Sequence, residues 1–464
     1  MTLSGFSSTG RDDRGSALII TLMVMALITA LSSTVAVLTI NNLQASRQAQ
    51  QAGSAINAAD AGIAQAMSYL RTSGVKGLTC SPTCPANPWG NSTTPKSVNL
   101  PGPGGEAYKA WIEVVTAFPN ATNTPGVYTI HSTGSAAGTA QRSVAVDVNV
   151  ATDAIRAMFA RTIDGGGSAS VTRESVISTG CVYDRDHIHM VNGQMDAAYG
   201  IPIAVHSSQY ITRSNGSGQY CPSSDNGLVH KAGACNTTYP YDQDLMGGTY
   251  TSTSCASVAT SYPSYYGTKD FDGDGSADVR GSYIKDDAAL RQLFGIKSPP
   301  VSQARIDQLR AVAIAQGNYW TSASSWTSPD ENDAVMFFDL NGQPTNQRTV
   351  DLNNVSGFGR ASGLDASASA CPAKSLVIVI EAGNASLNSN QQLFASLILT
   401  GTNPYGKVTR ANGTADFVGS IYADSINLVG NVDISLDGCF LANLSPSLLD
   451  VQMSKYREND RGLS

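Results

Sequence analysis

The sequence predicts an α+β protein. A long N-terminal transmembrane helix packs on a small antiparallel sheet, and a large β-rich domain like a parallel β-helix follows, with one inserted helix. Three observations predict this class: an uncharged apolar N-terminal stretch, strand-like segments of period two, and short strands separated by Gly or Asn near the C-terminal end. We expect a leader, a helix, the sheet, the β-helix-like domain and a C-terminal tail at residues 1–15, 16–72, 73–152, 153–450 and 451–464.

The N-terminal region predicts a membrane span. Between Arg14 and Arg47 the sequence has no Asp, Glu, Lys or Arg, and residues 17–40 are long enough to cross a bilayer as one helix. A cleavable secretory signal is the competing interpretation, but its apolar core would be only about 7–15 residues long. Arg11 and Arg14 precede the span, so the positive-inside rule places the amino terminus in the cytoplasm and the chain after about residue 42 outside.

The helix is expected to continue well past the membrane. No proline occurs before Pro82, and residues 41–71 are rich in Ala, Gln and Leu. From Ala17 to Arg71 the helix would measure roughly 80 Å at 1.5 Å per residue. Its second half has one weakly apolar face that can pack on a domain, formed by Ala58, Ile63, Ala66, Met67 and Leu70.

The start of this helix resembles the class III signal of type IV pilins and type II secretion pseudopilins. A short polar leader ends in Arg14-Gly15, and Ser16-Ala-Leu-Ile-Ile opens the apolar helix. The sequence also resembles PilX-type minor pilins through Arg-Gly-Ser-Ala-Leu-Ile and the element Ala-Ala-Asp-Ala-Gly-Ile-Ala-Gln-Ala at residues 58–66. The resemblance implies cleavage by a prepilin peptidase between Gly15 and Ser16, methylation of the new terminus, and assembly with other pilin subunits.

One position departs from the pattern of that family. Most pilins carry Glu at the fifth mature position, where this sequence has Ile20. In the family this Glu neutralises the terminal ammonium of the subunit above it, so a subunit without it fits the filament tip. The resemblance therefore implies a minor pilin at or near the tip, which serves assembly initiation or adhesion to a surface or host-cell ligand. A plain anchor that never enters a filament is the alternative.

The region after the helix is predicted to form β-strands. Residues 109–115, 127–131 and 142–150 have the alternation and the β-branched content of an antiparallel sheet. The sequence segment at residues 128–137 again resembles PilX-type proteins. We expect a domain boundary near residues 151–153.

Beyond that boundary, short Val/Ile strands alternate with Gly and Asn turns, as at residues 168–172 and 175–180. Residues 417–423, 425–430 and 432–438 follow one another after one or two residues each, which favours a parallel β-helix over a β-sandwich.

A helix is expected to interrupt the β-rich domain after residue 301. Ser302 is a suitable N-cap and Gly317 a suitable C-cap. The expected apolar face, which would pack on the flank of the β-helix, consists of Ile306, Leu309, Ala313 and Ile314.

Composition excludes a basic nucleic-acid binder. Only 14% of the 464 residues are charged, against about 25% in an ordinary soluble domain. With 29 Lys and Arg against 36 Asp and Glu the net charge is -7, which gives no cationic field for phosphate backbones. We interpret the eight cysteines as extracellular disulfides of open connectivity, with structural zinc as the alternative; they are Cys80, Cys84, Cys181, Cys221, Cys235, Cys255, Cys371 and Cys439.

One loop has the spacing of a calcium site. Oxygen-bearing side chains occupy positions 1, 3, 5, 7 and 9 of an EF-hand-like loop with glycine at position 6, and a solvated acidic turn is the alternative. Position 12, where a bidentate Glu is usual, is Gly281. The expected calcium ligands are Asp270, Asp272, Asp274, Ser276 and Asp278.

No catalytic residues are expected, and the chain is predicted not to be an enzyme. The sequence lacks a Gly-x-Ser-x-Gly elbow. His187 and His189 are better explained as hydrogen-bonded polar side chains along a strand than as ligands of a metal ion. Two alternatives to a pilus protein remain open. One is a type II secretion tip pseudopilin. The other is a membrane-anchored β-helix enzyme acting on polysaccharide, for which Asp184, Arg185 and Asp186 form the only suitable cluster.

Overall fold

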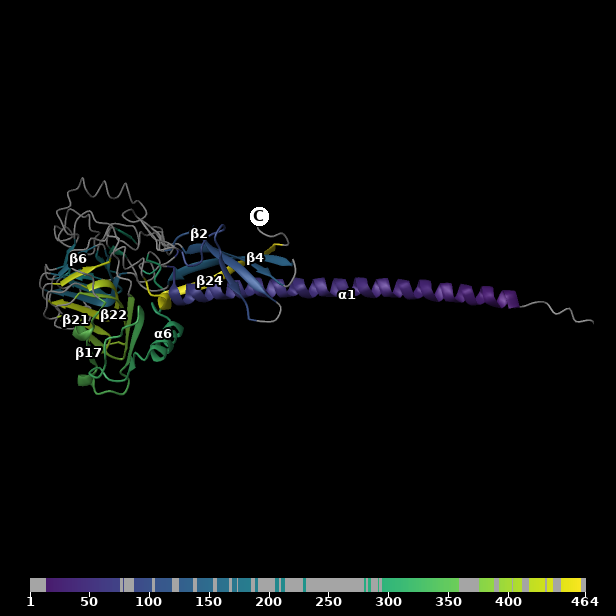
Figure 1. Ribbon diagram of the computed structural model, residues 1–464. Helices are drawn as coiled ribbons and strands as arrows, with labels where there is room; N and C mark the ends of the chain where they lie inside the picture. Colours follow the sequence, from purple (N-terminus) through teal and green to yellow (C-terminus); the bar gives the residue numbers. More distant parts are fainter. Residues whose placement is uncertain are drawn as a thin grey trace, which may run out of the picture.

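The computed structural model has one long helix, an antiparallel sheet on the distal part of that helix, and a large parallel β-domain beside the sheet (Figure 1). This arrangement confirms the predicted α+β class with a β-helix-like domain. The structure describes residues 14–75, 78, 87–101, 105–118, 125–136, 140–152, 157–166, 169–172, 174–184, 188–190, 205–207, 210–212, 228–230, 279–280, 283–284, 291, 294–358, 375–387, 392–402, 404–410, 417–429, 432–436 and 444–459.

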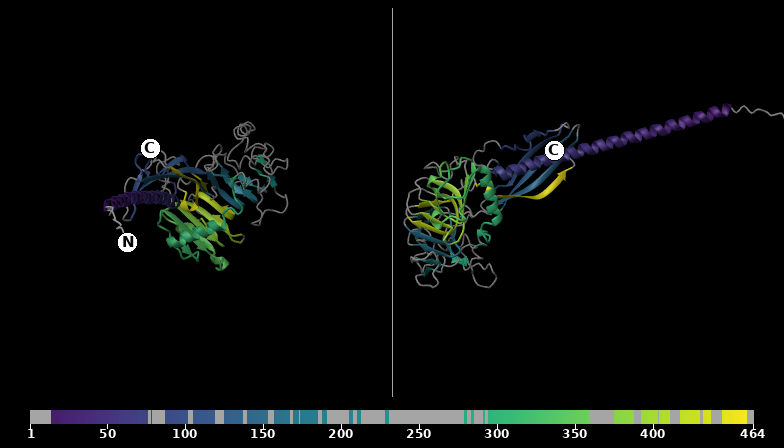
Figure 2. Two further views of the ribbon diagram at one scale, coloured as in Figure 1. Left: turned by 90° about the vertical axis from the view of Figure 1, so that its right-hand side faces the viewer. Right: turned by 90° about the horizontal axis from the view of Figure 1, so that it is seen from below.

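Helix α1 (Arg14–Ser73) contains 60 residues and is therefore about 90 Å long at 1.5 Å per residue. The right-hand view in Figure 2 shows it projecting from the rest of the molecule as a single rod. Only its distal part packs on a domain, and the five side chains of the predicted apolar face are all buried there. Helix and domain thus meet along the face that the sequence predicted.

The antiparallel sheet has five strands in the order β1-β2-β3-β4-β24. Strands β2, β3 and β4 confirm the three strands expected between the helix and residue 152, whereas β1 lies in a stretch where no strand was expected. The fifth strand comes from the C-terminal end of the chain. Their bounds are β1 (Lys96–Asn99), β2 (Ala107–Thr116), β3 (Gly126–Ser135), β4 (Gln141–Thr152) and β24 (Leu449–Asn459).

Strand β24 corrects the expectation of a C-terminal tail from residue 451. It pairs antiparallel with β4 from Leu449, opposite Thr152, to Asn459, opposite Ser143. Residues 452–458 are exposed on both faces of the strand, so no alternation of apolar and polar residues marks them in the sequence. The β-rich domain is therefore an insertion between two neighbouring strands of one sheet.

Small residues allow α1 to approach the sheet closely. Ala55 and Ala59 are fully buried against β3. A Cβ atom added to Gly134 of β3 would lie 2.0 Å from the Ala55 carbonyl oxygen and 2.4 Å from the Ala59 nitrogen. On the helix side, a Cβ atom on Gly62 would lie 2.3 Å from Ser132 Oγ. The Ala- and Gly-rich element at residues 58–66 thus has a packing role.

The inserted domain is a stack of parallel strands, as predicted. One row of parallel neighbours consists of β16 (Asp333–Asp339), β18 (Ser375–Glu381), β20 (Leu393–Thr400), β22 (Phe417–Val429), β5 (Met158–Gly166), β7 (Val176–Ser178) and β10 (Val205–Ser207). A second row consists of β17 (Thr349–Asp351), β19 (Asn384–Ser386), β21 (Lys407–Arg410), the second halves of β22 and β5, β8 (Cys181–Asp184) and β11 (Tyr210–Thr212).

Shorter elements complete the stack. A third row contains β23 (Val432–Ser435), β6 (Ala169–Thr172) and β9 (Ile188–Met190). The remaining elements are β12 (Leu228–His230), β13 (Val279–Arg280), β14 (Tyr283–Ile284), β15 (Tyr319–Trp320), η1 (Thr345–Gln347), η2 (Leu352–Asn354) and η3 (Pro446–Leu448).

The chain enters and leaves this stack at its middle. Strand β5, the first of the domain, pairs with β22, one of the last, with Met158 opposite Ile421. The strands that follow β5 extend the stack on one side, and the strands from β16 to β22 extend it on the other. Because both ends of the insertion lie on adjacent strands, the domain fits between β4 and β24 without opening their sheet.

Helix α6 (Gln303–Gln316) covers the outer face of the first row. The Ser302 side chain accepts a hydrogen bond from the Arg305 nitrogen, and Gly317 ends the helix with φ 77°, so both predicted caps are confirmed. Leu309 and Ala313 are fully buried, but Ile314 is 57% exposed and was wrongly assigned to the apolar face. The strands beneath α6 bury both faces, which explains continuous apolar runs such as residues 334–338.

Candidate functional site

The first half of α1 is an exposed apolar surface, and we call its residues 18–43 the bare segment. Its large hydrophobic side chains from Leu18 to Leu43 are each between 50% and 68% exposed. Fully burying one such side chain is worth about 1.5–3 kcal/mol, so this segment favours an apolar environment strongly. It is a helix long and apolar enough to cross a membrane, with a mean hydropathy of 2.3 in its most apolar stretch.

Five hydroxyl groups in this segment are satisfied within the helix. The Thr21 hydroxyl donates to the Ala17 carbonyl at 2.7 Å, and the Thr34 hydroxyl donates to the Ala30 carbonyl at 2.8 Å. Thr29, Ser33 and Thr39 make the same bond to the carbonyl four residues earlier. Since a lipid or protein interior offers no water, such internal bonds suit a helix that is surrounded by apolar groups.

The predicted processing and tip positions lie at the start of α1. Gly15 and Ser16 belong to its first turn. Ile20 is 61% exposed on the bare segment. After Arg14 the first acidic residue is Asp60, in the part of α1 that packs on the sheet. Neither Ile20 nor any other residue of the bare segment can therefore supply a carboxylate.

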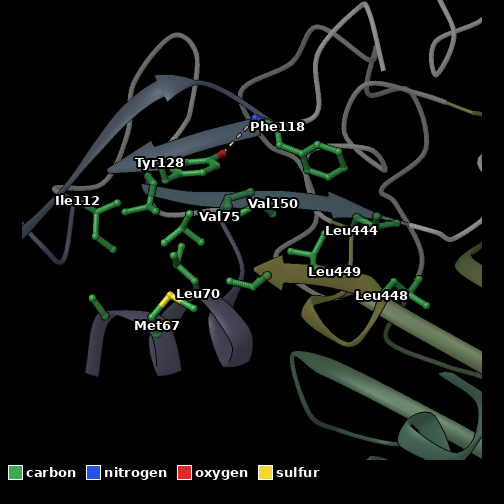
Figure 3. Packing of buried hydrophobic residues seen from close by; sticks show 14 of the residues in the cluster. Met67, Leu70, Val75, Ile112, Phe118, Tyr128, Val150, Leu444, Leu448 and Leu449 are labelled. Carbon is green, nitrogen blue, oxygen red and sulfur yellow. Dashed lines mark hydrogen bonds between the residues drawn. The ribbon is translucent and has the colours of Figure 1, made fainter. Parts of the chain in front are cut away.

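The inserted domain is attached to the stalk by an apolar junction. Figure 3 shows Leu448 and Leu449 beside Val150 of the sheet, on the side where Leu70 of α1 packs. All four side chains belong to one buried cluster that extends to α6 and the strands beneath it. The stalk, the sheet and the flank of the β-helix therefore share a core.

Arg305 of α6 ties the returning chain to this junction. Its side chain is 9% exposed, and its Nη1 donates to the Ser447 carbonyl at 3.0 Å and to the Leu449 carbonyl at 3.5 Å. From the other side, the Thr152 hydroxyl donates to the Leu448 carbonyl at 2.7 Å. These bonds fix the position at which the chain leaves the β-helix and begins β24.

The last strand is also tied to α1. Tyr456 donates a hydrogen bond to Asp60 Oδ1 at 3.0 Å. Burial and this bond to Asp60 raise the pKa of Tyr456 to about 12, because both disfavour the phenolate. On the outer face of the sheet, Arg457 pairs with Asp147, which also accepts from Thr129. The end of the chain is thus held by both layers.

One pair of carboxylates is brought together that the sequence did not single out. Asp339 and Glu381 are opposite each other on β16 and β18. Arg310 of α6 pairs with Glu381 at 2.6 Å, and Tyr319 donates to Asp339 at 3.0 Å. Burial and this hydrogen bond raise the pKa of Tyr319. Glu381 therefore holds α6 on the β-helix, and Asp339 holds the β15 residue Tyr319, roles that only the strand register reveals.

Most of the other predicted sites lie outside the described residues. These include the whole calcium loop from Asp270 to Asp278, the cluster at Arg185 and Asp186, and the side chains of all eight cysteines, although the Cys181 backbone belongs to β8. Within the described ranges, no group of three or more His, Cys, Asp or Glu side chains could hold a metal ion. The calcium and disulfide assignments stay predictions.

Comparisons with known proteins place few constraints on this chain. No protein-family model matches it, and no curated protein matches it. Among solved structures, the competence-associated pilin ComZ from Thermus thermophilus aligns with 88% of this chain and 97% of its own, at 12% identity and a TM-score of 0.23. A TM-score this low supports no conclusion about fold or function.

Proposed function

We propose that this protein is a non-catalytic minor pilin of a type IV pilus that acts at or near the filament tip. The observation that carries the proposal is the division of α1 into a bare apolar half and a half buried under an antiparallel sheet. The bare half is suited first to anchor the subunit in the membrane and then to pack among the helices of other pilins.

The resemblance of the N-terminal segment to the pilin signal supports a definite order of events. The subunit is inserted in the cytoplasmic membrane with its amino terminus inside and its β-domains outside. A prepilin peptidase then cleaves between Gly15 and Ser16, and the subunit enters the filament. In the extracellular filament, the β-helix serves pilus initiation, or adhesion to a surface or host-cell ligand.

The tip location rests on charge and on bulk. No carboxylate occurs in α1 before Asp60, so the bare segment cannot neutralise the ammonium of a subunit above it. The β-helix, inserted between β4 and β24, also stands beside the stalk as a second body larger than the sheet (Figure 1). Repeated along a thin shaft, such bodies would collide.

Labelling of filaments tests this proposal. Antibodies against the β-helix are expected to mark one end of a filament sparsely, and deletion is expected to reduce pilus number or adhesion without changing the composition of the shaft. An Ile20→Glu variant should allow label inside the shaft, whereas the matched Ile20→Leu variant should not. Regular labelling along the wild-type shaft would contradict the tip location.

A further inference from the structure

The two long outer faces of the β-helix differ in chemistry. The face beneath α6 is apolar and covered. In the second row, Ala385, Val408 and Ile426 point inward and are fully buried. The residues on either side of each point outward and are all polar. We call these six the polar ladder: Asn384, Ser386, Lys407, Thr409, Ser425 and Asn427.

The strand register stacks these side chains in two straight rows. Thr409 lies opposite Ser386 on one neighbouring strand and opposite Asn427 on the other. Lys407 lies opposite Ser425, and its backbone nitrogen donates to Asn384 Oδ1 at 3.0 Å. Neighbouring strands are about 4.8 Å apart, so the rows repeat at that interval. None of the six side chains is buried.

The ladder extends on both sides. Strand β17 adds Thr349 and Asp351, opposite Asn384 and Ser386, and β5 adds Thr162 and Asp164, opposite Ser425 and Asn427. Thr162 is only 4% exposed, so on β5 the accessible side chain of this face is that of Asp164.

We propose that the polar ladder binds an extended, uncharged β-1,4-linked polysaccharide, which lies across the strands along the axis of the stack. Hydroxyl and amide groups both donate and accept hydrogen bonds, as sugar hydroxyls do. The interval between strands is comparable to the length of one sugar in such a chain, so successive sugars meet successive strands. The ladder is held by backbone pairing on every strand, and binding therefore orders little of the protein.

The chemistry of the ladder argues against a nucleic acid. Single-stranded nucleic acids are bound by several cations and by aromatic side chains on which bases stack. The ladder has one cation, Lys407, and no aromatic residue, and its extensions add the carboxylates of Asp351 on β17 and Asp164 on β5. A neutral polymer rich in hydroxyl groups fits this balance of charge.

The location of the ladder suits a ligand outside the cell. In Figure 1, β17 and β21 lie farther from α1 than α6 does, so the ladder is on the side of the domain remote from the stalk. The inference deepens the proposed function by naming the class of ligand. Binding by the purified protein is independent of where the subunit sits in a filament, so the two proposals fail separately.

Binding of hexasaccharides tests the inference. The full-length protein in detergent is titrated with cellohexaose, chitohexaose and mannohexaose by saturation-transfer NMR and calorimetry. At least one should bind, and more tightly than its own disaccharide, because a longer chain meets more strands. The Thr409→Glu variant, which adds bulk and charge to the middle strand, should weaken binding at least about tenfold.

The controls separate the ladder from the rest of the surface. Ala311→Glu adds the same charge on the exposed side of α6 and should bind as the wild type does. Thr409→Val keeps the shape and removes only the hydroxyl, which also donates to the Ala385 carbonyl at 3.3 Å, so it should weaken binding with at most a small decrease in melting temperature. Failure of all three hexasaccharides to bind at millimolar concentration would overturn the inference. So would equal binding by the Thr409→Glu variant, or displacement of the sugar by single-stranded DNA.

Discussion

The close contact between α1 and β3 predicts that Gly134→Ala destabilises the stalk domain. The added Cβ would lie 2.0 Å from the Ala55 carbonyl oxygen, whereas ordinary contacts begin at 3.4 Å. The helix would have to move away by about 3.4 minus 2.0, or 1.4 Å, if it moved straight back. The atoms that clash belong to the helix backbone, so no side-chain rotation relieves the contact.

The cost follows from overpacking. Inserting one methyl group into a well-packed core costs about 1–3 kcal/mol, and a backbone clash belongs at the upper end of that range. Alanine in place of glycine recovers roughly 0.5–1 kcal/mol through the unfolded chain. We therefore expect a net loss of about 2 kcal/mol, which corresponds to a roughly 30-fold decrease in protection against hydrogen exchange.

Hydrogen exchange resolved by peptide measures this loss in the stalk domain alone. Amides of β3 and β4 should lose protection in Gly134→Ala, and amides of β18 and β20 in the β-helix should lose less. The matched control is Gly53→Ala, which makes the same chemical change on α1 where no atom lies within 4 Å. Unchanged protection in Gly134→Ala, or an effect equal to that of Gly53→Ala, would refute the reasoning.

Four further predictions test other parts of the chain. Mass spectrometry of the native protein should show a mature terminus at Ser16 that is lost when Gly15 is replaced; an intact Met1 would contradict the pilin assignment. Calcium chelation should lower the melting temperature through mass action on the folded state, and Asp272→Ala should abolish that response; an unchanged response would show that the loop is only an acidic turn. Neutral Tyr456 is favoured in the folded state, so its contribution to stability is complete below pH 10 and is lost as pH rises toward about 12. The Tyr456→Phe variant should therefore lose less stability over that range. Arg305→Ala leaves two carbonyls of the junction without their donor at a cost of about 1–3 kcal/mol, which faster exchange in residues 444–449 would reveal.

Local signals in the sequence determined a large part of this fold. The absence of charge between Arg14 and Arg47 predicted the helix, and the caps Ser302 and Gly317 predicted α6. The alternation at residues 142–150 predicted β4. Each of these signals acts within a few residues, through backbone hydrogen bonds or the side of the chain that must be buried. They can be recognised in the sequence without any knowledge of distant partners.

Only the tertiary structure decided how distant segments pair. Strand β24 joins β4 across an insertion of roughly 300 residues, and β22 joins β5 from opposite ends of that insertion. Residues 452–458 of the edge strand β24 are exposed on both faces of the sheet, so burial imposes no alternating pattern on their sequence. The polar ladder, the pairing of Arg310 with Glu381, and the junction held by Arg305 all depend on register between strands or contacts between domains. A backbone hydrogen bond is alike for every partner, so the sequence within a strand does not specify which strand it joins.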